Sequence, residues 1–410
     1  MKEIKIKEIP YPYVRVGTNY YKYIICPLAS GDEVLKLIIW TAETIKNDYG
    51  KEYLLKNIPR FEGFCMVPAH IGFAEVVKKH LNKYEQIPFK PVKGNYSIIS
   101  EFLTHIFQEQ IEVGLDYLTI LYRHPLEKLP VLCLVSKERN TGKTTFLNFL
   151  KLLFGANFTY NTNEDFRSNF NSHWSSKLIV AVDEVLLDKK EDSERIKNLS
   201  TAKCFKSESK GVDKIEVEII CKFILCSNNV TNFIHIEQGE TRYWVREILP
   251  YKSKENENLL TEIEAQVPAF LHFLLQRELK YHKTTRMWFD FKTIETNALK
   301  RVIRNNKNKL EMQIILSIIE LIDSVEIDDY YFCVKDIQFN LSKTTKGNID
   351  NSAIMRVLKD EWKLKPNTNT SSYFTYKYSN EGFFVKHNDK GRYYSINRAW
   401  ITENFDDLMT

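Results

Sequence analysis

Short, continuous apolar runs dominate the middle of the chain. Three of them, at 131–135, 178–182 and 223–226, have about the length of a strand and are separated by helical or polar segments. Strands that are apolar on both faces are typical of a parallel sheet covered by helices on both sides. The pattern therefore predicts an α/β core over residues 128–250, which ends at Pro250 and the hydrophilic run that follows it.

The flanking regions show other periodicities. Residues 1–94 begin with alternating polar and apolar positions and reach a segment at 35–48 with helical spacing, which predicts a mixed α+β N-terminal region. Residues 95–127 carry apolar side chains at helical spacing and are expected to form a helical collar before the core. Helices are expected through 251–325. In 326–410, two short helices and then a glycine-containing hairpin predict a winged-helix-like C-terminal domain, with any other small α+β module as the alternative.

Composition narrows the class of protein without naming a function. Lys and Arg number 58 against 53 for Asp and Glu, a net charge of +5 that permits a polyanionic partner but does not require one. The seven cysteines form no CxxC pair, which argues against a disulfide framework and a zinc ribbon. No apolar stretch approaches the 18 or more residues of a membrane span. We expect a cytoplasmic protein without a membrane partner.

The strongest chemical signal lies between residues 132 and 147, where an apolar strand, a polar turn, Gly-Lys-Thr and an amphipathic helix follow one another. This is the context of a phosphate-binding loop, in which backbone N–H groups and a helix N-terminus surround an anion. Lys143 is placed to reach the β- and γ-phosphates, and the Thr144 hydroxyl to bind Mg²⁺. The predicted nucleotide-binding residues are Asn140, Thr141, Gly142, Lys143, Thr144 and Thr145.

One position departs from the phosphate-loop pattern G-x4-G-K-[ST]. Lys137 stands where the first glycine is expected, so the turn has to form there without a glycine's freedom at positive φ. An accidental Gly-Lys-Thr at the start of a helix is the alternative interpretation.

Polar residues also follow the next two apolar runs. Asp183 and Glu184 come directly after 178–182, and we assign Asp183 to the metal and Glu184 to the base that polarises the attacking water. Asn228 follows 223–226, and its amide is predicted to orient that water beside the γ-phosphate. Each feature alone is as typical of an ordinary turn. Together, in this order and spacing, they indicate one nucleotide site.

Two arginines, Arg242 and Arg246, flank an aromatic pair further along the chain. A guanidinium presented across a subunit boundary would neutralise transition-state charge on a neighbour's nucleotide, and Arg242 is our candidate for this finger. A surface arginine or a structural ion pair is the alternative.

These motifs resemble those of superfamily 3 helicases, the AAA+ group of phage, plasmid and virus replication proteins. Asn140 to Thr144, the pair Asp183 and Glu184, and the strand ending at Ser227 and Asn228 resemble motifs A, B and C of that group. Because a helical collar precedes the phosphate loop, the chain also resembles the helicase portions of phage and mobile-element primase-helicases, which are related to the poxvirus-type group. The resemblance covers roughly residues 95–250. It implies an AAA+ P-loop core, ATP and Mg²⁺ as cofactors, and a homo-oligomeric ring, expected to be a hexamer, around one DNA strand.

Between motifs B and C the same group carries a hairpin that contacts DNA. Lys203, Lys206, Lys210 and Lys214 occupy that position, and such spaced lysines would hold one strand through its phosphates. A solvated basic loop is the alternative. In the C-terminal region, basic residues between 356 and 365 would place a helix against DNA, unless this region is a lid on the ATPase.

The sequence thus predicts an ATP-dependent DNA helicase for phage or mobile-element replication, with a separate primase or other replication proteins as partners. Two rivals remain. An AAA+ switch of a signalling or defence system would share the nucleotide site without unwinding DNA. A non-catalytic initiator or loader would work through its C-terminal domain, and Lys137 slightly favours it.

Overall fold

The computed structural model divides into two compact units, Met1–Asn305 and Asn306–Thr410. The structure describes residues 12–27, 29, 33–168, 171, 173–187, 190–209, 212–237, 239–251, 256–306, 309–344, 350–379 and 381–405. Each unit is described separately below.

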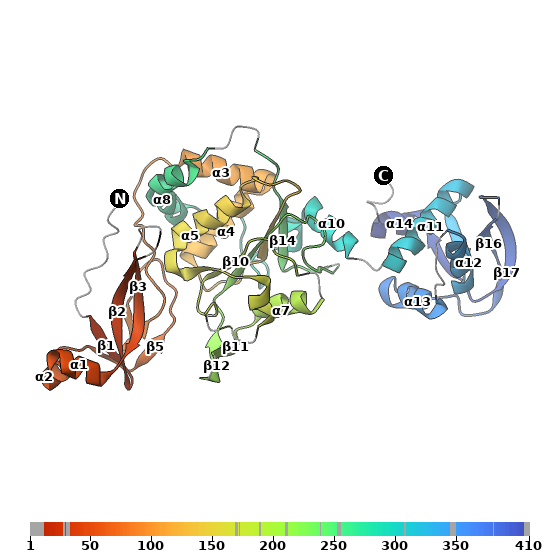
Figure 1. The fold of residues 1–410 in the computed structure, drawn as a ribbon. Coiled ribbons are helices and arrows are strands. Elements are labelled where there is room, and N and C mark those ends of the chain that lie inside the picture. The colour runs from red at the N-terminus through yellow and green to blue at the C-terminus, as the bar shows by residue number, and fades with distance from the viewer. Residues whose placement is uncertain are drawn as a thin grey trace. The chain divides into compact units, whose positions relative to one another are not determined.

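A five-stranded parallel sheet forms the centre of the first unit (Figure 1). Its strands stand in the order β14-β8-β13-β10-β9, and every neighbouring pair is parallel. The three apolar runs are confirmed as the adjacent strands β8, β13 and β10. The edge strands β9 and β14 were not predicted, because one is only three residues long and the other is an aromatic pair set among arginines. The bounds are β8 Val131–Val135, β9 Phe158–Tyr160, β10 Ile179–Val182, β13 Lys222–Ser227 and β14 Tyr243–Glu247.

Helices cover both faces of this sheet. Along β8, Leu132 and Leu134 belong to one hydrophobic core, whereas Val131, Cys133 and Val135 belong to another, as the two-residue period of a strand requires. Because both faces are covered, the three central strands β8, β10 and β13 carry charged, hydroxyl or amide side chains only at their ends. The first core contains α3 (Ser97–Phe107), α4 (Ile111–Arg123), α5 (Lys143–Phe154) and α8 (Leu259–Gln276), and the second contains α7 (Lys190–Thr201) and α10 (Asn297–Asn305) (Figure 1).

The path of the chain through the sheet creates a crevice. From β8 the chain passes to the far edge at β9, returns through β10 and β13, and then crosses β8 to form β14. In open parallel sheets, ligands bind outside the carboxyl ends of the strands where the strand order reverses. Here that position lies at the carboxyl end of β8.

Within the predicted collar, residues 95–127, the structure has two helices, α3 and α4, joined by a 3₁₀ turn, η1 (Gln108–Gln110). Gly114 allows them to pack closely, because a Cβ at this position would lie 2.3 Å from the ring of Phe107. The two helices are therefore packed closely on each other, and both contribute side chains to the first hydrophobic core.

The N-terminal region is mixed α+β, as predicted, but the helix expected at 35–48 is wrong in its first half. Residues up to 40 form β3 (Glu33–Trp40), which pairs with β2 along its whole length, and only α1 (Ala42–Tyr49) is helical, with Thr41 as its N-cap. The β-branched residues Ile38 and Ile39 favour the strand. The other elements are β1 (Tyr13–Val16), β2 (Asn19–Pro27), α2 (Lys51–Lys56), β4 (Arg60–Phe61), β5 (Gly63–Cys65), β6 (Val76–Val77) and β7 (His80–Asn82).

An antiparallel pair, β11 (Cys204–Ser209) and β12 (Val212–Glu218), occupies the position of the predicted lysine hairpin. In Figure 1 it projects from the α7 side of the sheet. Lys210 and the side chain of Lys214 lie outside the described residues.

The second unit has its own core and begins earlier than expected. The predicted helical segment 251–325 is divided at 305, because α11 (Lys309–Val325) packs Ile314, Ile318 and Ile322 into the C-terminal core. The expected order of helix, helix and hairpin is present. The elements are β15 (Asp329–Phe332), α12 (Val334–Thr344), α13 (Asn351–Arg356), the π-helix η3 (Val357–Glu361), β16 (Ser371–Tyr378), β17 (Phe384–Gly391), β18 (Tyr394–Asn397) and α14 (Arg398–Phe405).

Of the helices that the structure describes, none is both long and apolar enough to cross a membrane.

Candidate functional site

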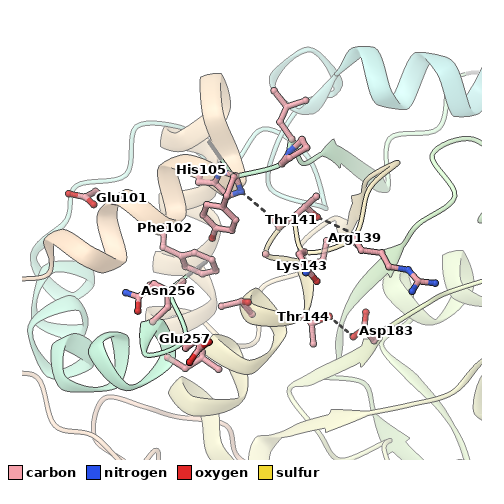
Figure 2. Close-up of a pocket in the computed structure, with 18 of the residues that line it drawn as sticks. Glu101, Phe102, His105, Arg139, Thr141, Lys143, Thr144, Asp183, Asn256 and Glu257 are labelled. Atoms are coloured by element: carbon pink, nitrogen blue, oxygen red, sulfur yellow. Dashed lines mark hydrogen bonds between the residues drawn. The ribbon is translucent and has the colours of Figure 1, made fainter. Parts of the chain in front are cut away.

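A cleft of about 1120 Å³ lies at the carboxyl edge of the parallel sheet. All nine predicted residues of the phosphate loop and of the strand ends line it: Asn140, Thr141, Gly142, Lys143, Thr144, Thr145, Asp183, Glu184 and Asn228. Figure 2 shows Thr141, Lys143, Thr144 and Asp183 on one side of the cleft and α3, with Phe102 and His105, on the other. Lys143 and Asn228, which are 85 residues apart in the sequence, therefore meet in one concave site.

The turn between β8 and α5 explains why Lys137 is tolerated. Its left-handed residues are Asn140, with φ 56°, and Gly142, with φ 95°, whereas Lys137 is not among the residues of positive φ. Asparagine is one of the few residues that adopt this conformation readily. Gly142 is required for a second reason, since a Cβ there would lie 3.0 Å from the hydroxyl of Tyr251. The first glycine of the pattern is thus not needed for this turn.

Lys143 lies at the start of α5 with 7% of its surface exposed. Its Nζ donates to Asn228 Oδ1 at 2.8 Å, to Thr141 Oγ1 at 3.4 Å and to Ser136 Oγ. Burial lowers the pKa of Lys143, and the nearby carboxylates of Asp183 and Glu184 only partly oppose this. An ammonium group that is buried among neutral oxygens has lost its hydration. A bound anion would compensate for that loss with an opposite charge, so these surroundings favour the binding of an anion.

Two oxygen donors stand together beside this lysine. Thr144 Oγ1 donates to Asp183 Oδ2 at 2.8 Å (Figure 2). Hydroxyl and carboxylate oxygens are the ligands that Mg²⁺ prefers, so this pair suits that ion. Glu184 is exposed and has φ 62°, a conformation rare for glutamate, at the rim of the cleft.

The wall opposite the phosphate loop was missed by the sequence prediction. His105 of α3 stacks on Tyr251 with ring centroids 3.8 Å apart, and its Nε2 lies 3.0 Å from the carbonyl oxygen of Thr141 (Figure 2). Phe102, Leu249 and Pro250 extend this wall. No motif marks these residues, although Tyr251 follows β14 at the same carboxyl edge. The collar and the predicted boundary at 250 therefore form half of the site.

Arg242 and Arg246 lie outside this cleft. Arg242 precedes β14, and its carbonyl oxygen accepts from the N–H of Val131 at the start of β8, which places it at the opposite, amino edge of the sheet. Its guanidinium donates to Glu240 Oε2 at 2.7 Å. Arg246 is buried and pairs with Glu109. Within one chain Arg242 thus makes the ion pair that was the alternative interpretation, and its role towards a neighbouring chain stays a prediction.

Of the four lysines predicted for the hairpin, Lys203 and Lys206 have side chains that the structure describes. Both are exposed, and neither lines the cleft. Their backbones are fixed, since Lys203 O accepts from the N–H of Ile219 and Lys206 O accepts from the side chain of Asn171. The hairpin thus presents exposed lysines from an ordered base.

The chain is similar to proteins of known sequence and structure. Residues 134–242 match a family of unknown function, DUF5906. Over 201 residues the chain is 27% identical to the DNA primase-polymerase of Nitratiruptor phage NrS-1, an alignment that spans 44% of this chain and 28% of that protein. The matched family segment includes the phosphate loop, Asp183, Asn228 and Arg242.

Solved structures resemble nearly the whole chain. An apo structure of the NrS-1 C-terminal region matches with a TM-score of 0.63 at 18% identity and covers 89% of this chain and 95% of that one. A second apo form of that region matches with a TM-score of 0.61 at 16% identity, covering 92% and 96%. At this identity the likeness concerns the fold, which both units share with that region.

Proposed function

We propose that the chain is the ATP-driven motor of a phage or mobile-element DNA replication protein, an AAA+ helicase of superfamily 3 type. The observation that carries the proposal is the meeting of Lys143, the pair Thr144 and Asp183, and Asn228 in one cleft. A cation, two hard oxygen donors and an amide are the groups that a triphosphate and its magnesium require.

Each residue has a separate role in this proposal. Lys143 would exchange its neutral partners for the β- and γ-phosphates. Thr144 and Asp183 would hold Mg²⁺, which would supply positive charge beside the transferred group. Glu184 accepts a proton from the attacking water, and Asn228 orients that water. The stacked pair His105 and Tyr251 lies where the nucleoside would enter between α3 and the phosphate loop.

The relatives support a role in replication. The similar phage protein is named a DNA primase-polymerase, and the chain covers nearly all of that protein's solved C-terminal region. We assign no primase activity to this chain, because the proposal rests on the nucleotide cleft. A primase on another chain or segment is the partner we expect.

Ring formation and DNA contact complete the proposal. The exposed lysines of the β11–β12 hairpin would hold one DNA strand in the channel of a hexamer. Arg242 would act on the nucleotide of a neighbouring copy, since it lies far from its own chain's cleft edge. The C-terminal unit, with its helix, helix and hairpin, would be the winged-helix-like domain.

The decisive experiment is ATP hydrolysis measured with and without single-stranded DNA. We expect DNA to stimulate hydrolysis, and Glu184→Gln to abolish hydrolysis while retaining nucleotide binding, because only the proton acceptor is removed. Hydrolysis that ignores DNA would favour an AAA+ switch. Nucleotide binding without hydrolysis in the unchanged protein would favour an initiator or loader.

A second measurement concerns the hairpin. Lys206→Ala is expected to lower the DNA stimulation while sparing basal hydrolysis, because Lys206 is exposed and does not line the cleft. Lys46→Ala, another exposed lysine on α1, is the matched control. Equal loss of basal and stimulated hydrolysis in Lys206→Ala would show that the hairpin is structural.

A further inference from the structure

The outer face of the β16–β17 hairpin in the second unit carries exposed aromatic rings. Phe374 is 55% exposed, and on the neighbouring strand β15 Tyr331 is 38% exposed, while Tyr330 and Phe332 on either side are fully buried. Tyr331 packs edge-on against Tyr393, with ring centroids 5.5 Å apart. Large aromatic side chains left at a surface indicate an interaction site.

Lysines stand among these rings. In the antiparallel register Phe374 faces Asn388, Tyr376 faces Lys386 and Ser372 faces Lys390, so these side chains share one face of the hairpin. Lys386 Nζ lies 4.4 Å from the centroid of the Phe374 ring. The face thus alternates rings with positive charge.

The opposite face of the same hairpin serves the core. There Tyr373 and Thr375 are buried, and Tyr373 donates to Asp336 of α12 at 2.7 Å. Because the core already holds the hairpin through this face, the exposed rings of the other face are not required for its position. A groove of about 350 Å³ beside the hairpin is lined by Phe374, Tyr376 and Lys386 together with Tyr331 and Tyr393. Tyr373, whose ring lies 5.0 Å from that of Tyr393, also lines it, and Asp329 is its acidic member.

We propose that this surface, defined by Tyr331, Phe374, Lys386, Lys390 and Tyr393, binds single-stranded nucleic acid. Exposed rings offer platforms on which bases stack, and interleaved lysines hold the phosphates between them. Paired bases would not reach the rings, so a single strand is preferred over a duplex. The site is distinct from the cleft and the lysine hairpin, which belong to the other unit.

This inference does not depend on the proposed ATPase, because binding is measured without nucleotide. The affinity of the full-length chain for a fluorescent oligothymidylate is followed by anisotropy. Phe374→Leu keeps an apolar side chain but removes the ring, and we expect it to weaken binding about tenfold, the effect of losing one stacked base. Phe374→Trp is expected to restore binding.

Lys386→Gln should lower the dependence of log affinity on log salt by about one.

Phe339→Leu is the matched control. Phe339 is 40% exposed on α12 and also has a lysine over its ring, 5.5 Å from the centroid, but it does not line the groove. Equal affinity in Phe374→Leu and the unchanged protein would overturn the proposal, as would equal weakening by Phe374→Leu and Phe339→Leu.

A site-specific readout makes the test independent of any second DNA contact. Photo-crosslinking with an iodouracil-containing strand should label peptides that contain Phe374, Tyr331 or Tyr393. Labelling confined to the β11–β12 hairpin would overturn the proposal. Concentration-dependent self-association that is lost in Phe374→Leu, with DNA affinity unchanged, would instead assign the surface to a second copy of the chain.

Discussion

Lys143 and Lys222 are buried lysines at opposite edges of the same parallel sheet. Lys143, at the carboxyl edge, donates to side-chain oxygens of Ser136, Thr141 and Asn228 at the floor of an open cleft. Lys222, at the amino edge, is 2% exposed and donates to backbone carbonyl oxygens, 2.9 Å away in Ile220 and also in Pro125. Burial lowers the pKa of both.

The difference lies in what each ammonium group can exchange. The partners of Lys143 are side chains that keep other hydrogen bonds or face the cleft, so an entering anion can replace them. The partners of Lys222 are backbone groups of the core, which would be left unpaired without it. A buried lysine therefore indicates a binding site only where its partners are replaceable and a cavity lies beside it.

The largest expected effect comes from exchanging each lysine for methionine. Lys143→Met should reduce ATP hydrolysis about 100- to 1000-fold, as the loss of one preorganised charge does in other enzymes, with little change in stability. Lys222→Met should leave hydrolysis unchanged and lower the free energy of unfolding by about 1–3 kcal/mol, because two carbonyl oxygens lose their donor. ATPase assays and urea unfolding of both variants measure the contrast. Loss of hydrolysis in a stable Lys222→Met protein would contradict it.

A substitution of Arg242 tests whether the amino edge of the sheet has only a structural role. In a ring, Arg242→Ala is expected to reduce hydrolysis about 100-fold without weakening nucleotide binding, because its own cleft is intact. Glu184→Gln removes the cleft's base but keeps Arg242. Mixing these two inactive variants should restore activity, since some interfaces then combine an intact cleft with an intact arginine.

The control for this mixing experiment is each inactive variant mixed with more of itself. If Arg242 serves only its pair with Glu240, Arg242→Ala will lower the melting temperature and the mixture will stay inactive. That result would mean that the amino edge of the sheet has only a structural role and the carboxyl edge alone serves hydrolysis. It would also remove the argument for a ring.

The sequence predicted the carboxyl edge well, because each of its parts is local. An apolar run followed by a polar residue fixes both the strand and the place where its side chain emerges, so Lys143, Asp183 and Asn228 were found together. The motif does not say which residue of the turn takes positive φ, and Asn140 takes it here. The effect of Lys137 on turnover stays a prediction.

Other parts were beyond local reasoning. Helical spacing at 35–40 also fits a strand, and only pairing with β2 decides between them. His105 reaches the cleft because α3 packs over the phosphate loop, a tertiary contact that no spacing encodes. The boundary at 305 depends on which core α11 joins.

The pH dependence of the free energy of unfolding tests whether Lys222, at the amino edge of the sheet, carries a charge in the folded protein. Burial lowers the pKa of Lys222 from 10.5 to about 7. Above pH 7 the folded state loses this proton while the unfolded state keeps it, so this residue's contribution to the free energy of unfolding rises with pH. Between pH 7 and about pH 8.5 the difference between the unchanged protein and Lys222→Met should grow by about 1.5 kcal/mol. Urea unfolding at several pH values measures it, and a constant difference would mean that Lys222 keeps its charge.

The smallest effect concerns the wall that faces the phosphate loop. His105→Ala removes a stacked ring from the cleft, and we expect the KM for ATP to rise about three- to tenfold with kcat nearly unchanged, because the lost contact is worth about 1 kcal/mol and acts before the chemical step. His105→Phe keeps the stack on Tyr251 and should retain the low KM. His124→Ala, which removes a histidine stacked on Trp288 away from the cleft lining, is the control. A fall in kcat at constant KM would instead place His105 at the phosphates, through its contact with Thr141, and would join the two walls of the cleft into one catalytic unit.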